Sequence, residues 1–171
     1  MLDLTGYIRD VPDFPKEGII FKDITTLLQD AEAFRSSVDA FVEHYRDADI
    51  DFIVAIESRG FIFGGALAIA LGCGFIPVRK PGKLPASTFT ETYELEYGTD
   101  SIEIHQDAIA SGKRVLIIDD LLATGGTVAA TARLLRRFDC VVVGAGFLIE
   151  LDFLKGREKL GDLDIFTLVH Y

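Results

Sequence analysis

Residues 115–127, with the sequence VLIIDDLLATGGT, restrict the possible folds of this chain more than any other stretch. The first four form a continuous apolar run rich in β-branched side chains, which is typical of a parallel strand buried on both faces. Two adjacent carboxylates, Asp119 and Asp120, follow where that strand is expected to end, and a glycine-rich turn then leads into an alanine-rich helical segment. Strand, turn and helix in this order predict an α/β fold with a parallel sheet.

The turn and the two acids also predict a ligand site, because ligands of parallel α/β sheets bind at the carboxyl edge of the strands. Glycines allow close backbone approach, hydroxyls add donors, and the start of a helix offers unpaired N–H groups to an anion. We therefore expect Asp119 and Asp120 to hold a diol, and a phosphate to lie on Ala123, Thr124, Gly125, Gly126 and Thr127. The alternative is an ordinary strand–turn–helix connection that binds no ligand. A GG turn alone would favour this alternative, but the full order of strand, DD, TGGT and helix argues against it.

The composition is that of a folded protein, since 49% of the 171 residues are hydrophobic and 26% are charged. It predicts one domain over residues 1–171. The formal net charge of -10 argues against a nucleic-acid surface, which needs a basic patch. There is neither an apolar run of membrane-spanning length nor a signal-peptide pattern, so we expect no membrane partner and a cytoplasmic location. Cys73 and Cys140 are expected to be reduced core residues, and the histidines show no metal-ligand spacing.

Further periodic segments extend the predicted sheet and its helices. Strands are predicted at residues 51–57, 74–79, 140–151 and 163–171, and helices at residues 30–45, 61–71, 127–138 and 154–160. Asp30 is the expected N-cap of the first helix. Arg59 follows the strand at 51–57 and precedes Gly60, a position from which it could bind an anion. The alternative is a surface arginine on a connecting turn, with no ligand.

Two segments lie outside this core. Residues 1–30 contain Pro12 and Pro15, which break regular helix, and we expect them to form an N-terminal flap. Residues 81–105 alternate around a Gly98 turn and predict a β-hairpin, which is either a mobile lid or a static edge hairpin.

The segments DDLLATGGT, ESRGF, PDFP…GIIFKDIT and LKGREKL together resemble the type I phosphoribosyltransferase family over almost the whole chain. The resemblance implies a single-domain fold with a mainly parallel sheet flanked by helices, a base-covering flap and a β-hairpin lid. It implies transfer of a phosphoribosyl group from 5-phosphoribosyl-1-pyrophosphate (PRPP) to adenine, with Mg²⁺ held mainly by PRPP and pyrophosphate rather than by the protein. It also implies a homodimer, and a non-proline cis peptide in the ESRGF loop, for which the Ser58–Arg59 bond is the candidate.

The resemblance assigns roles to individual residues. Asp119 and Asp120 would hold the ribose hydroxyls, and residues 123–127 the 5′-phosphate. Pyrophosphate would contact Arg59, Arg79 and Lys83. Glu96 and Tyr97 would belong to the lid, with Arg59 and Glu96 catalytic and Glu96 handling a proton of the base. Adenine would lie against Ile20, Phe21, Lys22 and Leu151, although the family often has arginine at the position of Lys22.

Two alternatives stay open. A hypoxanthine, xanthine or orotate transferase would use the same PRPP loop. A PRPP-binding transcriptional regulator would need a nucleic-acid-reading element or a basic face, which this acidic chain does not offer.

Overall fold

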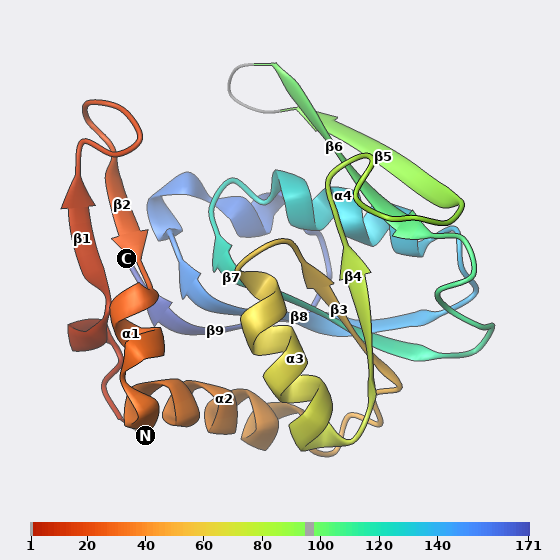
Figure 1. Ribbon diagram of the computed structural model, residues 1–171, viewed down its shortest axis with the longest axis horizontal. Coiled ribbons are helices and arrows are strands. Elements are labelled where there is room, and N and C mark those ends of the chain that lie inside the picture. The colour runs from red at the N-terminus through yellow and green to blue at the C-terminus, as the bar shows by residue number, and fades with distance from the viewer. Residues whose placement is uncertain (1, 95–97) are drawn as a thin grey trace.

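Five parallel strands form the central sheet of the computed structural model, which describes residues 2–94 and 98–171 (Figure 1). The strand order is β4-β3-β7-β8-β9, so that β7 lies in the middle. The strands are β3 (Phe52–Ile56), β4 (Gly74–Val78), β7 (Arg114–Leu122), β8 (Val141–Glu150) and β9 (Ile165–His170). All four pairings are parallel, which confirms the predicted sheet.

Helices cover both faces of the sheet, because alternate strand residues face opposite sides. Ile53 and Ala55 face the core under α2 (Ala31–Tyr45) and α3 (Gly60–Leu71), whereas Val54 and Ile56 face the core under α4 (Gly126–Leu135). The predicted cap of α2 is present, since the Asp30 side chain accepts hydrogen bonds from the backbone N–H groups of Glu32 and Ala33. No helix among the described residues is long and apolar enough to cross a membrane.

Two antiparallel pairs flank the sheet (Figure 1). β1 (Arg9–Pro12) and β2 (Ile20–Asp23) form the first, which lies at the left in this view. β5 (Thr88–Glu94) and β6 (Thr99–His105) form the second, which packs on α4. The remaining elements are short: η1 (Thr5–Tyr7), α1 (Thr25–Gln29), η2 (Asp152–Leu154) and η3 (Gly156–Lys159).

The structure corrects four local expectations. β7 continues through Asp119 and Asp120 to Leu122, because β8 pairs with it that far. Residues 154–160 form 3₁₀ turns rather than an α-helix, since Lys155 adopts a positive φ of 52° that interrupts helical geometry. The non-proline cis peptide joins Glu57 to Ser58, one bond earlier than expected. Cys73 and Cys140 are free, as expected, but only partly buried.

Candidate functional site

The two carboxylates lie on β7 beyond the end of its neighbour β3. Pairing between β3 and β7 stops at Ala55 and Ile118, whereas pairing between β7 and β8 continues to Leu122. Asp119 and Asp120 therefore adjoin the segment that connects β3 to α3. From that segment Arg59 places its Nε 2.8 Å from Oδ2 of Asp120.

This ion pair leaves a buried acceptor without a donor. Asp120 is only 5% exposed, and its Oδ2 receives no hydrogen bond from any described residue, although it forms the ion pair with Arg59. Burial raises the pKa of the Asp119 carboxyl, and the charge of Asp120 raises it further. Burial also raises the pKa of Asp120, while Arg59 acts in the opposite direction. Hydroxyl donors from a ligand would satisfy such acceptors at the edge of the sheet.

The loop after β7 encloses a small cavity of about 70 Å³, lined by Asp119 and residues 121–128. Gly125 has φ 76° and is the N-cap of α4, so the first backbone N–H groups of that helix adjoin the cavity. Glycine is needed here because this φ disfavours other residues. All five predicted phosphate-binding residues, 123–127, line this cavity.

A second cavity of about 440 Å³ lies beside the first and is mostly apolar in its lining. Of the four residues predicted to contact a base, Ile20, Lys22 and Leu151 line it together. Its other lining residues are Gly18, Ile19, Thr124, Phe153, Leu154 and Tyr171. Thr124 lines both cavities, so the two adjoin at this residue.

Phe21 is not brought to this cavity, because successive residues of β2 point to opposite sides. Its ring lies 5.1 Å from the ring of Phe14 in an edge-on arrangement. The guanidinium of Arg59 lies over the Phe21 ring, 5.1 Å from its centroid. Phe21 thus contacts the arginine of the carboxylate site rather than the apolar cavity.

Lys22 is held in place at the wall of the apolar cavity. Its Nζ lies 2.6 Å from Oδ1 of Asp10 and 3.5 Å from the centroid of the Tyr171 ring. Only 11% of the side chain is exposed. The cavity wall therefore carries one fixed cation, stabilised by a carboxylate and an aromatic face.

The basic loop after β4 is tied to the end of β3. Arg79 donates from Nε to Oε2 of Glu57 at 2.9 Å and from Nη1 to the carbonyl oxygen of Lys83 at 3.2 Å. The same Glu57 oxygen accepts from the backbone N–H of Lys80. Lys83 itself is exposed. Glu96 and Tyr97, the two predicted lid residues, lie outside the described residues.

Glycines that the sequence analysis left unassigned allow close contacts at this site. A Cβ atom on Gly60 would come 2.9 Å from Oδ1 of Asp119. A Cβ atom on Gly156 would come 2.3 Å from the carbonyl oxygen of Ala123, in the loop predicted to bind phosphate. The motifs ESRGF and LKGREKL contain these glycines, but only the folded chain shows what lies opposite them.

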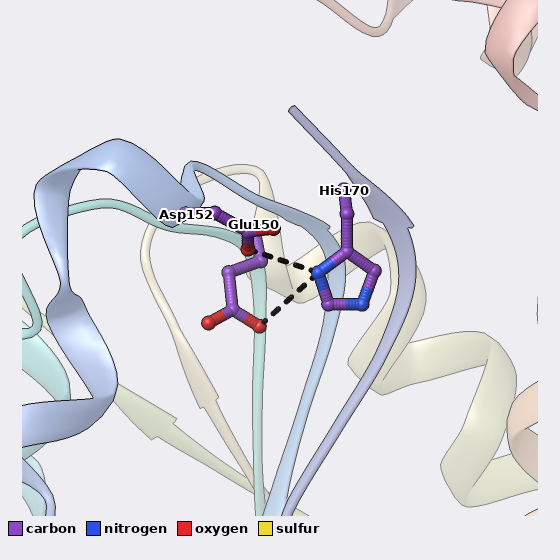
Figure 2. A group of neighbouring side chains, drawn as sticks. All are labelled: Glu150, Asp152 and His170. Atoms are coloured by element: carbon purple, nitrogen blue, oxygen red, sulfur yellow. Dashed lines mark hydrogen bonds and ion pairs between the residues drawn. The ribbon is translucent and has the colours of Figure 1, made fainter.

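One group of side chains has donor atoms spaced as metal ligands are (Figure 2). Glu150, Asp152 and His170 place one donor atom each within 4.8 Å of one another. Both Glu150 oxygens, however, already accept hydrogen bonds from Arg157. A cation here would have to compete with a guanidinium, so we interpret the group as part of an ion-pair network.

A parallel sheet with two adjacent carboxylates, a glycine-rich helix start and an adjoining apolar cavity at its carboxyl edge is the arrangement expected of a phosphoribosyltransferase domain. A family model of the phosphoribosyl transferase domain matches residues 23–168. The adenine phosphoribosyltransferase of Acaryochloris marina is 62% identical over 170 residues, which cover 99% of this chain and 100% of that protein.

Solved structures agree with the sequence comparison. The crystal structure of adenine phosphoribosyltransferase from Thermoanaerobacter pseudethanolicus matches with a TM-score of 0.95 and 54% identity, covering 98% of each chain. The Saccharomyces cerevisiae enzyme, complexed with an imino-altritol bisphosphate and adenine, matches with a TM-score of 0.91 and 46% identity, covering 96% of each chain. The chain belongs to the adenine phosphoribosyltransferase family.

Proposed function

We propose that this protein transfers the 5-phosphoribosyl group of PRPP to adenine, forming AMP and pyrophosphate in purine salvage. The observation that carries this function is Thr124, which lines both the 70 Å³ phosphate-loop cavity and the 440 Å³ apolar cavity. A nucleoside monophosphate needs such a pair of adjoining cavities, one for its phosphate and one for its base. Asp119, which also lines the smaller cavity, is then placed to accept from the ribose hydroxyls.

The reaction needs little covalent chemistry from the protein. Departure of pyrophosphate from C1 of the ribose builds positive charge on the sugar ring, and the site must hold both reactants and stabilise the leaving anion. Asp119 and Asp120 supply negative charge beside the ring. Arg59, which is 35% exposed at its side chain, can turn toward the leaving group. In this proposal Arg79 and Lys83 provide further positive charge on the pyrophosphate side.

Mg²⁺ is the cofactor of the proposed reaction, held mainly by oxygens of PRPP and pyrophosphate. The chain's residues fit this arrangement, because Asp119 lines the smaller cavity and its neighbour Asp120 has a buried oxygen that lacks a hydrogen-bond donor among the described residues. When bound, the ion would neutralise charge on the leaving pyrophosphate. Arg59 and Lys83 would carry the rest of that charge.

The proposal treats residues 1–171 as one domain in which residues 1–30 cover the base and residues 81–105 close over PRPP. Closure would exclude water, which otherwise hydrolyses PRPP. Glu96 and Tyr97 would enter the site from this hairpin, with Glu96 handling the proton of the base. Replacing Glu96 with glutamine should then lower turnover by about ten- to a hundredfold.

A homodimer in the cytoplasm completes the proposal. Ile62 and Ile69 on α3 and Phe75 on the edge strand β4 are exposed apolar side chains, with exposed fractions of 38%, 85% and 38%. An apolar surface of this kind is typical of subunit contacts. The free cysteines, Cys73 and Cys140, fit a reducing compartment.

The test is to incubate the protein with PRPP, magnesium chloride and adenine, hypoxanthine, xanthine or orotate in separate reactions. Chromatography identifies the nucleotide formed, and AMP from adenine alone is expected. The variant Asp120→Asn should lose most activity, whereas Asp39→Asn on the exposed face of α2 should not. Preferential use of hypoxanthine would overturn the adenine assignment, and PRPP binding without any nucleotide formation would favour the regulator.

A further inference from the structure

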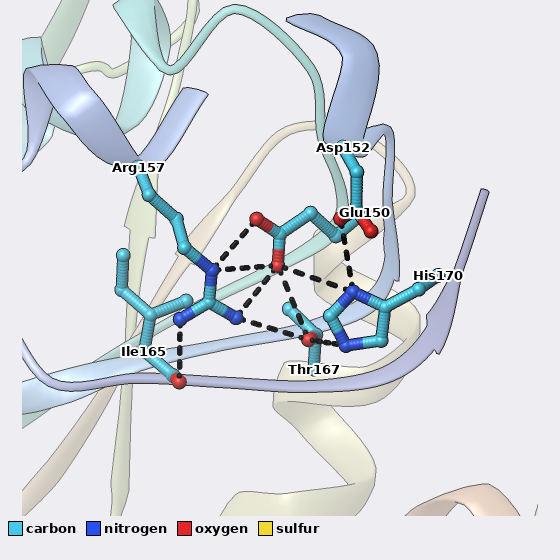
Figure 3. A network of polar contacts seen from close by, with 6 residues as sticks. All are labelled: Glu150, Asp152, Arg157, Ile165, Thr167 and His170. Atoms are coloured by element: carbon cyan, nitrogen blue, oxygen red, sulfur yellow. Dashed lines mark hydrogen bonds and ion pairs between the residues drawn. The ribbon is translucent and has the colours of Figure 1, made fainter. Parts of the chain in front are cut away.

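Glu150 ends β8 in a buried position and is held by one arginine (Figure 3). Only 4% of the residue is exposed. Arg157 donates from Nε to Oε1 at 2.7 Å and from Nη2 to Oε2 at 2.6 Å, the fork-to-fork geometry of a strong ion pair. The same guanidinium donates to the carbonyl oxygen of Ile165 and to the hydroxyl of Thr167, each at 3.2 Å. Arg157 is thereby fixed to both β8 and β9.

The polar network continues from Arg157 in η3 to the 3₁₀ turn that precedes it, η2. His170 contacts the hydroxyl of Thr167 with Nε2 at 2.7 Å and a carboxylate oxygen of Asp152 with Nδ1 at 2.9 Å. Asp152 is the first residue of η2, and Arg157 lies in η3. Arg157 therefore holds η3 to β8 and β9, whereas His170 holds η2 through Asp152 (Figure 3).

This segment contacts the phosphate-binding loop through Gly156, the residue next to Arg157. The contact is backbone against backbone: a Cβ on Gly156 would lie 2.3 Å from the Ala123 carbonyl oxygen and 3.1 Å from the Gly125 nitrogen. A Cβ on Gly125 would in turn lie 2.4 Å from the Gly156 carbonyl oxygen. Two glycines facing each other leave no side chain to absorb a shift, so a displacement of Gly156 is passed directly to the loop.

We propose that Arg157 is a positioning residue for phosphate binding. Its bonds to Glu150 and Ile165 fix Gly156 against residues 123–125 and thereby set the direction of the backbone N–H groups that meet the 5′-phosphate. This inference rests on the proposed function, since it assumes that the 70 Å³ cavity holds a phosphate. Neither Arg157 nor Glu150 lines either substrate cavity, so the effect acts through the backbone.

The wall of the apolar cavity is held by backbone hydrogen bonds that do not involve Arg157. The Leu151 backbone N–H donates to the carbonyl oxygen of Leu122 at 3.0 Å, and the Asp152 N–H donates to that of Tyr171 at 2.8 Å. These bonds fix the cavity wall at Leu151 without Arg157. Loss of the arginine should therefore affect phosphate binding and leave adenine binding intact.

The experiment compares the variant Arg157→Gln with the unmodified protein in calorimetric titrations with AMP, ribose 5-phosphate and adenine. We expect the Kd of AMP and of ribose 5-phosphate to rise about tenfold and the Kd of adenine to change by less than about twofold. In kinetics, KM for PRPP should rise by a similar factor with kcat within about threefold. The control is Arg46→Gln, which removes an exposed ion pair with Glu43 and should change none of these values.

Two further variants separate positioning from a purely structural role. Arg157→Lys keeps the charge but cannot reproduce the forked geometry, so it should restore part of the phosphate affinity. Gly156→Ala keeps the ion pair but places a methyl group against Ala123, so it should weaken phosphate binding as Arg157→Gln does.

If folded Arg157→Gln binds AMP normally, or loses affinity for AMP and adenine equally, the inference is wrong. Should Arg157→Gln fail to fold, the same comparison with Gly156→Ala decides. If the unmodified protein binds no AMP, the proposed function itself fails.

Discussion

Gly60, the first residue of α3, lies directly against the carboxylate of Asp119 on β7. A Cβ atom at Gly60 would come 2.9 Å from Oδ1 of Asp119 and 3.0 Å from the carbonyl oxygen of Ile118. Neither neighbour can give way easily, because the carbonyl belongs to the central strand and the carboxylate to the proposed ribose site. The absence of a side chain at Gly60 therefore leaves room for the carboxylate pair.

The variant Gly60→Ala should lower kcat/KM for PRPP by about tenfold or more, because the added methyl group displaces Asp119. The contact with the backbone of the central strand should also lower the thermal midpoint, offset only in part by the helix preference of alanine. Gly65→Ala in the same helix is a matched control, since nothing lies within 4 Å of a Cβ built there. Steady-state kinetics with varied PRPP check the prediction, and equal activity of the two variants would contradict it.

A second prediction concerns the cost of keeping Asp119 charged. Its pKa is raised well above the usual 3.8 by burial first and by Asp120 second. The folded state thus binds a proton more tightly than the unfolded state, so the free energy of unfolding decreases as pH rises from the unfolded pKa through the folded one. Asp119→Asn removes this loss and should raise the thermal midpoint at pH 7 to 8.

The pH dependence of this gain is the test. Each kcal/mol relieved should raise the midpoint by about 2–4 °C for a chain of this size. Below the usual pKa of an aspartate, both states of the unmodified protein are protonated, so the gain should become small as pH falls to 4. Thermal unfolding from pH 4 to 8 measures it, with Asp39→Asn as an exposed control. A difference in thermal midpoint between Asp119→Asn and the unmodified protein that is smaller at pH 7 than at pH 4 would contradict this prediction.

Much of the fold could be predicted from sequence, because its signals are local. The continuous apolar run at 115–118 marks the middle strand, and the helical spacing of the apolar residues Phe34, Phe41 and Tyr45 marks α2. The sequence places Asp119 and Asp120 at the ligand-binding edge, because parallel strands end at a common edge. It does not predict that both belong to β7, since the length of that strand depends on how far β8 continues beside it.

The remaining features depend on contacts between distant residues. Glu150 and His170 are cross-strand neighbours in the β8–β9 register, which spacing along the chain cannot reveal. The contact between Gly125 and Gly156 joins two loops, and no periodicity predicts it. The position of Phe21, by contrast, can be predicted from sequence. Side chains alternate along β2, so Ile20 and Lys22 point to one side and Phe21 points to the other.

Lys22 offers a test of whether the 440 Å³ cavity binds the base. Its ammonium is fixed between Asp10 and the Tyr171 ring at the wall of the 440 Å³ cavity. Lys22→Met should loosen this wall and raise KM for adenine by about three- to tenfold, with KM for PRPP unchanged. Lys22→Arg keeps a cation that can stack on Tyr171 and should stay within about threefold of the unmodified protein. Initial rates with either substrate varied distinguish the two effects, and an increase in KM for PRPP alone would exclude Lys22 from base binding.

The last prediction concerns the exposed apolar surface of α3 and β4. Ile62 and Ile69 are seven residues apart and therefore lie on one side of α3, and the Phe61 and Phe75 rings, 5.6 Å apart, join the helix to the edge strand. If this surface is the subunit contact, a charge at its most exposed position, Ile69, should separate the dimer. Light scattering should give twice the chain mass for the unmodified protein and the chain mass for Ile69→Lys. Val141→Lys, which charges an exposed apolar residue at the start of β8, should remain dimeric. An unmodified protein that is monomeric at micromolar concentration, or a dimeric Ile69→Lys variant, would show that this surface has another role.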